Sequence, residues 1–218
     1  YQKAIDRVLE YLDPFIKNEG FNFRDFSPGG GFAIGYENNK LPPPISDYAK
    51  VITTTLIEKC QSLNINQPRL IIEPGRSIVG RAGVALYTVG VIKTIPSVRT
   101  YVSLDGGMGD NIRPALYDSK YEAVVANKMK NADPTEFATV TLAGKYCESG
   151  DLLVKDIKLP KIQSGDIVAI PASGAYCFAM SSNYNMNPRP AIVIIKDGTP
   201  KLIRKRETYE DLMALDVT

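Results

Sequence analysis

The pattern of apolar residues changes at about residue 80, and this change constrains the fold more than any other feature of the 218-residue sequence. Before it, stretches with helical spacing alternate with short strand-like runs, which is the order of parallel α/β units. After it, runs rich in Val, Ile, Thr and Tyr are separated by Gly, Pro, Asn and Asp turns. The sequence therefore predicts an α/β segment over 1–80, followed by a mainly β domain over 81–218.

Two helices are predicted in the first segment. Apolar residues at helical spacing indicate one over 1–19, which Pro14 should kink or end early and Gly20 should stop. The second is expected to begin at Ser46 as N-cap and run to about Ser62. Its predicted buried face consists of Ala49, Ile52, Leu56 and Cys60.

Strand-like runs separate and follow these helices. The run over 21–26 leads into Ser27-Pro28-Gly29-Gly30-Gly31, and a buried strand is predicted over 69–72, before Glu73-Pro74-Gly75-Arg76. In the second segment, strands are predicted over 84–95, 100–104, 138–142, 166–170, 191–195 and 201–204. No helix of useful length is expected there before 207–215.

Composition excludes several classes of function. Twenty-six basic and 24 acidic side chains leave a formal charge of +2, which argues against a nucleic-acid partner. No apolar run approaches the ~20 residues of a membrane span, and no signal-peptide pattern opens the chain. The sequence has no histidine and three widely spaced cysteines, so neither a metal site nor a disulfide framework is expected, and a cytoplasmic location is the simplest interpretation.

Two glycine-containing loops are candidates for binding phosphate. Gly29-Gly30-Gly31 follows one predicted strand, and Glu73-Pro74-Gly75-Arg76 follows the next. Backbone without side chains lets N–H groups approach an anion closely, although a triple glycine alone is as consistent with a plain tight turn. Two such loops after successive strands favour a phosphate-bearing ligand.

The β segment contains a second group of candidate residues. Arg113 and Tyr117 lie four residues apart and could bind a carboxylate, or could be a solvated arginine beside a half-buried tyrosine. Cys147 and Glu148 place a thiol next to a carboxylate in a turn, and Tyr176 follows a strand that ends in small residues. Cys60, by contrast, is expected to be buried.

The order GGGF, EPGR, DGGM, NIRPALYD, CESGD, SGAY resembles the C-terminal half of the diaminopimelate decarboxylases. GGGF and EPGR would also fit ornithine or arginine decarboxylases, whereas RPALY combined with CESGD favours the former. Ser27-Pro28 before the glycines and Cys177 after the SGAY tyrosine depart from the family pattern. The resemblance covers essentially the whole chain and implies a partial (β/α)8 TIM-type barrel followed by a C-terminal β-barrel-like domain.

The resemblance also implies roles for individual residues. The phosphate of pyridoxal 5'-phosphate (PLP) would be held by Gly30, Gly31 and the segment Glu73, Pro74, Gly75 and Arg76. Arg76, Arg113 and Tyr117 would bind the far carboxylate of a diamino dicarboxylic acid, and Glu148 its distal ammonium. Tyr176 would lie beside cofactor and substrate, and Cys147 would be the proton donor. No metal is implied.

The implied reaction is decarboxylation of meso-diaminopimelate to L-lysine by a homodimer, in which Cys147 and Glu148 serve the partner's active site. The Schiff-base lysine and a ring-stacking histidine of this family belong to a segment absent from this sequence, so we expect a fragment that is inactive alone. Its helix faces Ile5/Leu9/Leu12 and Ile52/Leu56 are then expected to lack their normal cover. A non-catalytic homologue or interaction module, or another basic amino-acid decarboxylase, remains an alternative.

Overall fold

The computed structural model describes residues 1–37, 40–129 and 134–217. These form two compact units, which we describe separately. Unit 1 consists of residues 1–35 and 40–79, and unit 2 of residues 36–37 and 80–217. None of the described helices combines the length and apolar character that a helix needs to cross a bilayer.

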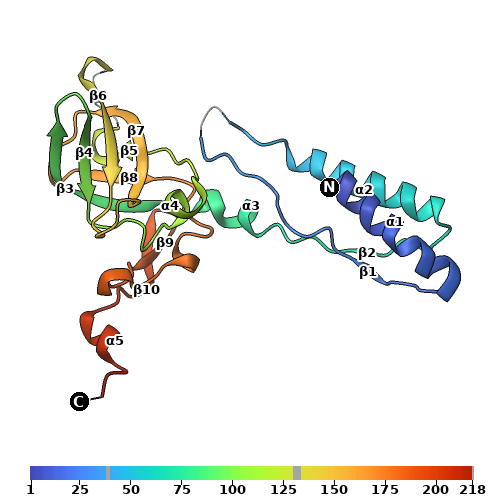
Figure 1. The fold of residues 1–218 in the computed structure, drawn as a ribbon. Helices are drawn as coiled ribbons and strands as arrows, with labels where there is room; N and C mark the ends of the chain where they lie inside the picture. Colours follow the sequence, from blue (N-terminus) through green and yellow to red (C-terminus); the bar gives the residue numbers. More distant parts are fainter. Residues whose placement is uncertain (38–39, 130–133, 218) are drawn as a thin grey trace. The chain divides into compact units, whose positions relative to one another are not determined.

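Unit 1 is built on two long helices and a pair of short parallel strands (Figure 1). Its elements are α1 (Gln2–Glu19), β1 (Asp25–Phe26), α2 (Ile45–Ser62), β2 (Arg69–Leu70) and α3 (Gly75–Val79). Strand β1 pairs in parallel with β2, with Phe26 opposite Leu70. The loops that follow these two strands therefore leave at the same edge of the pair.

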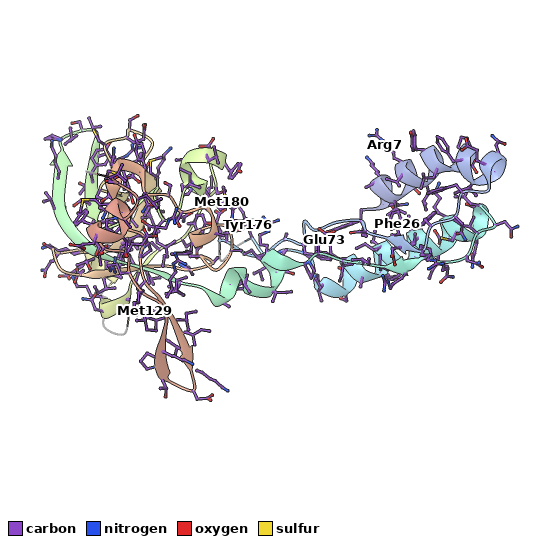
Figure 2. The ribbon with its side chains drawn as sticks, turned by 90° about the horizontal axis from the view of Figure 1, so that it is seen from below. Arg7, Phe26, Glu73, Met129, Tyr176 and Met180 are labelled. Atoms are coloured by element: carbon purple, nitrogen blue, oxygen red, sulfur yellow. The ribbon has the colours of Figure 1, made fainter. Side chains whose placement is uncertain are left out.

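The two long helices cover each other, which corrects the expectation that their apolar faces are left bare. Ile5 and Leu9 of α1 and Ile52 and Leu56 of α2 are all buried in one core, which also contains Cys60 as predicted. Ala49, predicted on the same buried face, is exposed. Phe26, labelled in Figure 2, contributes to that core from β1. The apolar face of each helix is therefore covered by the other helix of the same unit.

The helix boundaries differ from the predictions in two places. Helix α1 is continuous through Pro14 to Glu19 and ends at Gly20, which has a φ of 67°. A proline removes only one hydrogen bond, and here it does not end the helix. Helix α2 begins at Ile45 rather than after a Ser46 cap, because the carbonyl of Pro44 already accepts the N–H of Asp47 at 3.0 Å.

The strands of unit 1 are shorter and less buried than predicted. Only Asp25–Phe26 of the expected 21–26 run is a strand, because pairing with β2 extends no further. Strand β2 ends at Leu70, and Ile71 and Ile72 are 38% and 47% exposed, so the buried strand predicted over 69–72 is wrong.

Unit 2 contains a six-stranded sheet that is nearly closed into a barrel (Figure 1). Its strands are β3 (Ala85–Ile95), β4 (Arg99–Leu104), β5 (Val124–Val125), β6 (Phe137–Ala143), β7 (Leu152–Pro160) and β8 (Ile167–Ile170). The order is β5-β8-β3-β4-β6-β7, and the two end strands also contact each other. All neighbours are antiparallel except β4 and β6. The predicted barrel-like sheet is thus confirmed.

The remaining elements of unit 2 lie outside this sheet. Strands β9 (Ile192–Lys196) and β10 (Thr199–Arg204) form an antiparallel hairpin, and α5 (Tyr209–Met213) follows it. Helix α4 (Arg113–Tyr117) is a single short helix between β4 and β5, in a stretch where none was predicted. The barrel core consists of inward-facing apolar side chains, among them Val102, Leu142, Val168 and Ile170.

Asp166, immediately before β8, joins the turn that precedes this strand to the segment of Asn127 and Lys128. Its carboxylate accepts hydrogen bonds from Lys128 Nζ at 2.6 Å, Asn127 Nδ2 at 2.9 Å and the Gln163 N–H at 2.7 Å. Burial acts to raise the pKa of Asp166, but these donors outweigh it and hold the pKa below its usual value. The ionised carboxylate therefore stabilises the folded state.

We expect Asp166→Asn in the full-length protein to lower the melting temperature at pH 7, through loss of charged hydrogen bonds worth about 1.5–3 kcal/mol each. Because the folded pKa is the lower one, this contribution is complete above the unfolded pKa near ~4 and disappears as pH falls through the folded pKa. The gap between wild type and variant should thus narrow as pH is lowered from about 5 to below the folded pKa. A gap that stays constant in calorimetric scans across this range would contradict the assignment.

Candidate functional site

The glycine loops of unit 1 approach each other closely at the ends of β1 and β2. The N–H of Glu73 donates to Gly29 O at 3.3 Å, and Ser27 Oγ donates to Glu73 Oε1 at 2.8 Å. A Cβ on Gly30 would lie 2.7 Å from Glu73 O, so only glycine fits there. Gly29 and Gly31 have φ values of 79° and 89°. Glycine is therefore required at these positions by the local backbone.

Next to this contact, Arg76 carries an unsatisfied donor. Its Nε is buried and has no hydrogen-bond partner among the described residues. Pro74 contributes its carbonyl to the first turn of α3, where it accepts the N–H of Ile78 at 3.2 Å and the hydroxyl of Ser77 at 2.8 Å. A buried guanidinium nitrogen beside side-chain-free backbone is a donor set that suits a phosphate oxygen. The residues of this loop pair therefore fit the phosphate of PLP; Glu73 is labelled in Figure 2.

In unit 2, the guanidinium of Arg113 lies among tyrosine rings. Arg113 begins α4, and its Cζ is 5.0 Å from the ring centroid of Tyr36 and 5.4 Å from that of Tyr176. Its Nη1 donates to the hydroxyls of Tyr36 and Tyr121, the latter at 3.3 Å. The structure thus brings together Arg113 and Tyr176, two residues that the sequence placed in one site.

Tyr176 and Tyr117 are both available to a ligand. Tyr176, labelled in Figure 2, is 46% exposed and has a φ of 63°, a left-handed conformation that costs a non-glycine residue energy. Such strain is concentrated at functional sites. Tyr117, one turn after Arg113 on α4, is 59% exposed.

Cys147 and Glu148 lie in the loop between β6 and β7, and both are exposed. The N–H of Cys147 donates to Asn185 Oδ1 at 3.1 Å, and the N–H of Glu148 to Tyr146 O at 2.8 Å. Glu148 Oε1 accepts the N–H of Gly150 at 3.2 Å. The thiol is therefore presented to solvent on a loop whose backbone is held by hydrogen bonds.

A buried carboxylate that the sequence analysis left without a role organises this loop. Asp151 is 3% exposed and accepts the N–H of Tyr146 at 2.9 Å and of Met108 at 2.7 Å. Its carboxyl thus joins the Cys147 loop to the DGGM segment. Burial raises the pKa of Asp151 even though the two N–H groups act to lower it. A Cβ on Gly107 or Gly144 would lie within 3.0 Å of that carboxyl, so both positions need glycine.

The same segments contain other buried groups that the motifs did not reveal. Tyr87 donates to Asp110 Oδ2 at 2.6 Å, and burial raises the pKa of both side chains. Tyr146 stacks on Tyr184 at 6.0 Å, and burial raises the pKa of Tyr146 to about 12. Tyr36 lies far from Arg113 in the sequence, and Tyr121 stands in none of the motifs. Only the clustering of Asp and Tyr around Gly-rich turns could have signalled them.

No cluster of three or more Cys, Asp or Glu side chains that could hold a metal ion occurs among residues 1–37, 40–129 and 134–217. Of the predicted site residues in unit 2, Arg113 and Tyr176 lie together, and Cys147 and Glu148 are neighbours on the β6–β7 loop. Gly30, Gly31 and Glu73–Arg76 belong to unit 1, and Arg113, Tyr117, Cys147, Glu148 and Tyr176 to unit 2.

Residues 12–174 match the family described as "Pyridoxal-dependent decarboxylase, C-terminal sheet domain". The chain belongs to this family. A curated relative, diaminopimelate decarboxylase of Bacillus subtilis, is 45% identical over 98% of the chain, and that of Synechocystis is 48% identical over 90%. The chain spans about half the length of these relatives, 48% and 41% respectively.

Solved structures give the same family likeness. The diaminopimelate decarboxylase of M. jannaschii superposes with a TM-score of 0.89 at 36% identity, covering all of this chain and 48% of that one. The Helicobacter pylori enzyme, solved in complex with L-lysine, superposes at 0.82 with 33% identity, covering 99% of this chain and 50% of that one. The resemblance inferred from GGGF, EPGR, RPALY and CESGD is thereby confirmed.

Proposed function

We propose that this chain is the C-terminal half of a PLP-dependent carboxy-lyase that converts meso-diaminopimelate to L-lysine. The 45% identity over 98% of the chain to a diaminopimelate decarboxylase is the observation that carries the proposal. The arrangement of Arg113, Tyr176 and the Cys147 loop in unit 2 supports it. Residues 1–80 would belong to a (β/α)8 barrel, of which the parallel β1–β2 pair joined through α2 is a part, and residues 81–218 to the β domain.

The charge of each residue of this chain would determine which group of the cofactor or substrate it binds. Gly30, Gly31 and Glu73–Arg76 hold the PLP phosphate through N–H groups and the free Arg76 Nε. Arg113 and Tyr117 bind the carboxylate at the non-reacting end of the substrate. Glu148 pairs with the ammonium at that end. A site with paired cation and anion rejects substrates that would leave either unpaired.

When bound, PLP supplies an electron sink for the electron pair left as CO₂ departs. The thiol of Cys147 then donates a proton to the carbon that carried the lost carboxylate. Tyr176 would lie beside cofactor and substrate. By analogy with the family, Cys147 and Glu148 serve the active site of a second copy, so the working form is a cytoplasmic homodimer.

The direct experiment assays the full-length protein that contains this chain, with PLP and meso-diaminopimelate, for stoichiometric L-lysine and CO₂. Ornithine, arginine and lysine are the competing substrates, and we expect turnover of them at least about 10⁴-fold lower in kcat/KM, because Arg113 and Tyr117 would be left without the carboxylate that they bind. Preference for one of these would favour another basic amino-acid decarboxylase. No turnover of any substrate by PLP-loaded protein would favour a non-catalytic homologue.

The phosphate assignment has a binding test of its own. Gly30→Ala places a Cβ against Glu73 O and should open the loop pair, so we expect PLP affinity to fall by about 10-fold or more, the effect of roughly 1–3 kcal/mol of overpacking. Gly165→Ala is the control: its φ of 89° makes alanine unfavourable through backbone strain rather than overpacking, and it lies in unit 2. Equal PLP affinity of Gly30→Ala and wild type in a fluorescence titration would refute the assignment.

A further inference from the structure

The three tyrosines around Arg113 do more than fill space beside it. Tyr36 comes from the short segment before residue 40, Tyr121 follows α4, and Tyr176 follows β8. The rings of Tyr36 and Tyr176 lie near the guanidinium of Arg113, at 5.0 Å and 5.4 Å from its Cζ. The hydroxyls of Tyr36 and Tyr121 accept hydrogen bonds from one nitrogen, Nη1.

Tyr121 is itself held in place. It is 4% exposed, its ring meets that of Tyr36 edge-on at 5.2 Å and 75°, and its hydroxyl lies 3.6 Å from the sulfur of Cys177. Cys177 is 4% exposed. Burial, reinforced by the neighbouring Cys177, raises the pKa of Tyr121, so the phenol keeps its hydrogen. Its oxygen can accept from Arg113 whether its hydroxyl donates to the sulfur of Cys177 or accepts from the thiol.

This arrangement fixes one nitrogen of the guanidinium and leaves Nε and Nη2 without a contact to these hydroxyls. A guanidinium binds a carboxylate best through two parallel N–H groups in one plane. An arginine side chain that is free in solution loses much rotamer entropy when it forms such a fork. An arginine already fixed by packing and hydrogen bonds loses less.

We propose that Tyr36 and Tyr121 are positioning residues, which preset the Arg113 guanidinium to take the carboxylate at the non-reacting end of the substrate. Cys177 supports Tyr121 in this role. The inference rests on the proposed function and goes beyond it, because it assigns selectivity for an amino-acid end, over a simple amine end, to residues outside the motifs.

The test compares two ligands that differ by one carboxylate. L-Lysine keeps the amino-acid end of the substrate, whereas cadaverine is the same diamine without it. In the PLP-loaded full-length protein, calorimetry should show Tyr36→Phe and Tyr121→Phe binding L-lysine about 3- to 10-fold more weakly, with cadaverine unchanged. In steady-state assays of meso-diaminopimelate, the same variants should raise KM with little change in kcat.

Tyr101→Phe is the matched control. Tyr101 also has an arginine over its ring, Arg99 at 6.0 Å, but that arginine is committed to Asp156. Removal of the Tyr101 hydroxyl should leave the ratio of L-lysine affinity to cadaverine affinity unchanged. Tyr36 is only partly buried, so Tyr36→Phe remains decisive if Tyr121→Phe folds poorly in melting scans.

An unchanged L-lysine affinity in Tyr36→Phe, or an equal loss for both ligands, would overturn the positioning role. Failure of the proposed function would give a different experimental result. The wild-type protein would then form no lysine from meso-diaminopimelate, whatever the ligand affinities of the variants.

Discussion

Replacing Cys147 with alanine should lower kcat of the full-length enzyme by about 10²–10⁴-fold, the usual contribution of a positioned proton donor. The thiol is exposed on a loop whose backbone is tied down by Asn185 and Asp151, so its removal deletes a reacting group without opening a core cavity. L-Lysine affinity should change by less than about 3-fold, because the thiol acts in the chemical step rather than in binding.

Glu148→Gln should fail in a different way. Loss of the carboxylate removes the partner of the distal ammonium, so KM should rise and discrimination against substrates lacking that group should weaken. Lys145→Ala, an exposed residue of the same loop, is the control and should retain kcat and KM. Full turnover by Cys147→Ala in single-turnover and steady-state assays would show that Cys147 is a surface thiol with no part in the reaction.

The strands of unit 2 were the most predictable part of the fold. The ends of β3, β4, β6, β8 and β9 lie within about two residues of the predicted ones, because β-branched runs bounded by Gly, Pro, Asn and Asp are strong local signals. Two strands of the sheet were missed, β5 and β7. Strand β5 spans only Val124–Val125. Strand β7 is interrupted at Asp156, which has a φ of 51° beside a register shift opposite Val140 and Leu142. A bulge of this kind breaks the alternation on which the prediction depends.

Burial in unit 1 could not be read from the sequence in the same way. Ile71 and Ile72 are as apolar as a buried strand requires, yet they are exposed, whereas Ile5 and Leu9 are fully buried against the second helix. An apolar pattern states which face of an element favours burial. It does not state which other element covers that face, since this is decided by tertiary packing.

In the candidate site, too, the motif residues could be predicted from the sequence, whereas their contacts could not. Arg113, Tyr176 and Cys147 stand in recognisable motifs, and the structure places the first two side by side. Tyr36 and Tyr121 could not be assigned from the sequence, because Tyr36 lies 77 residues before the arginine it contacts. Asp151 was visible in CESGD, but its function depends on a contact to the backbone of Met108, 43 residues earlier.

The contacts of the Asp151 carboxylate should determine both the stability of unit 2 and the position of Cys147. A Cβ on Gly144 would lie 2.0 Å from Asp151 Oδ2 and 2.4 Å from its Cγ. The carboxyl cannot move aside without releasing the N–H groups of Tyr146 and Met108 in the interior of unit 2. Overpacking combined with lost buried hydrogen bonds should cost at least about 2 kcal/mol.

We therefore expect Gly144→Ala to lower the melting temperature of the unit 2 transition by about 4 °C or more, and to lower kcat because the Cys147 loop loses its anchor. Gly150→Ala is the matched control in the same loop: its Cβ would meet nothing closer than 3.8 Å, and its φ is not in the left-handed region. Calorimetry and limited proteolysis of the β6–β7 loop measure both effects. If the two alanine variants melt and turn over alike, Asp151 does not hold this loop, and the position of Cys147 must be set by the Asn185 contact alone.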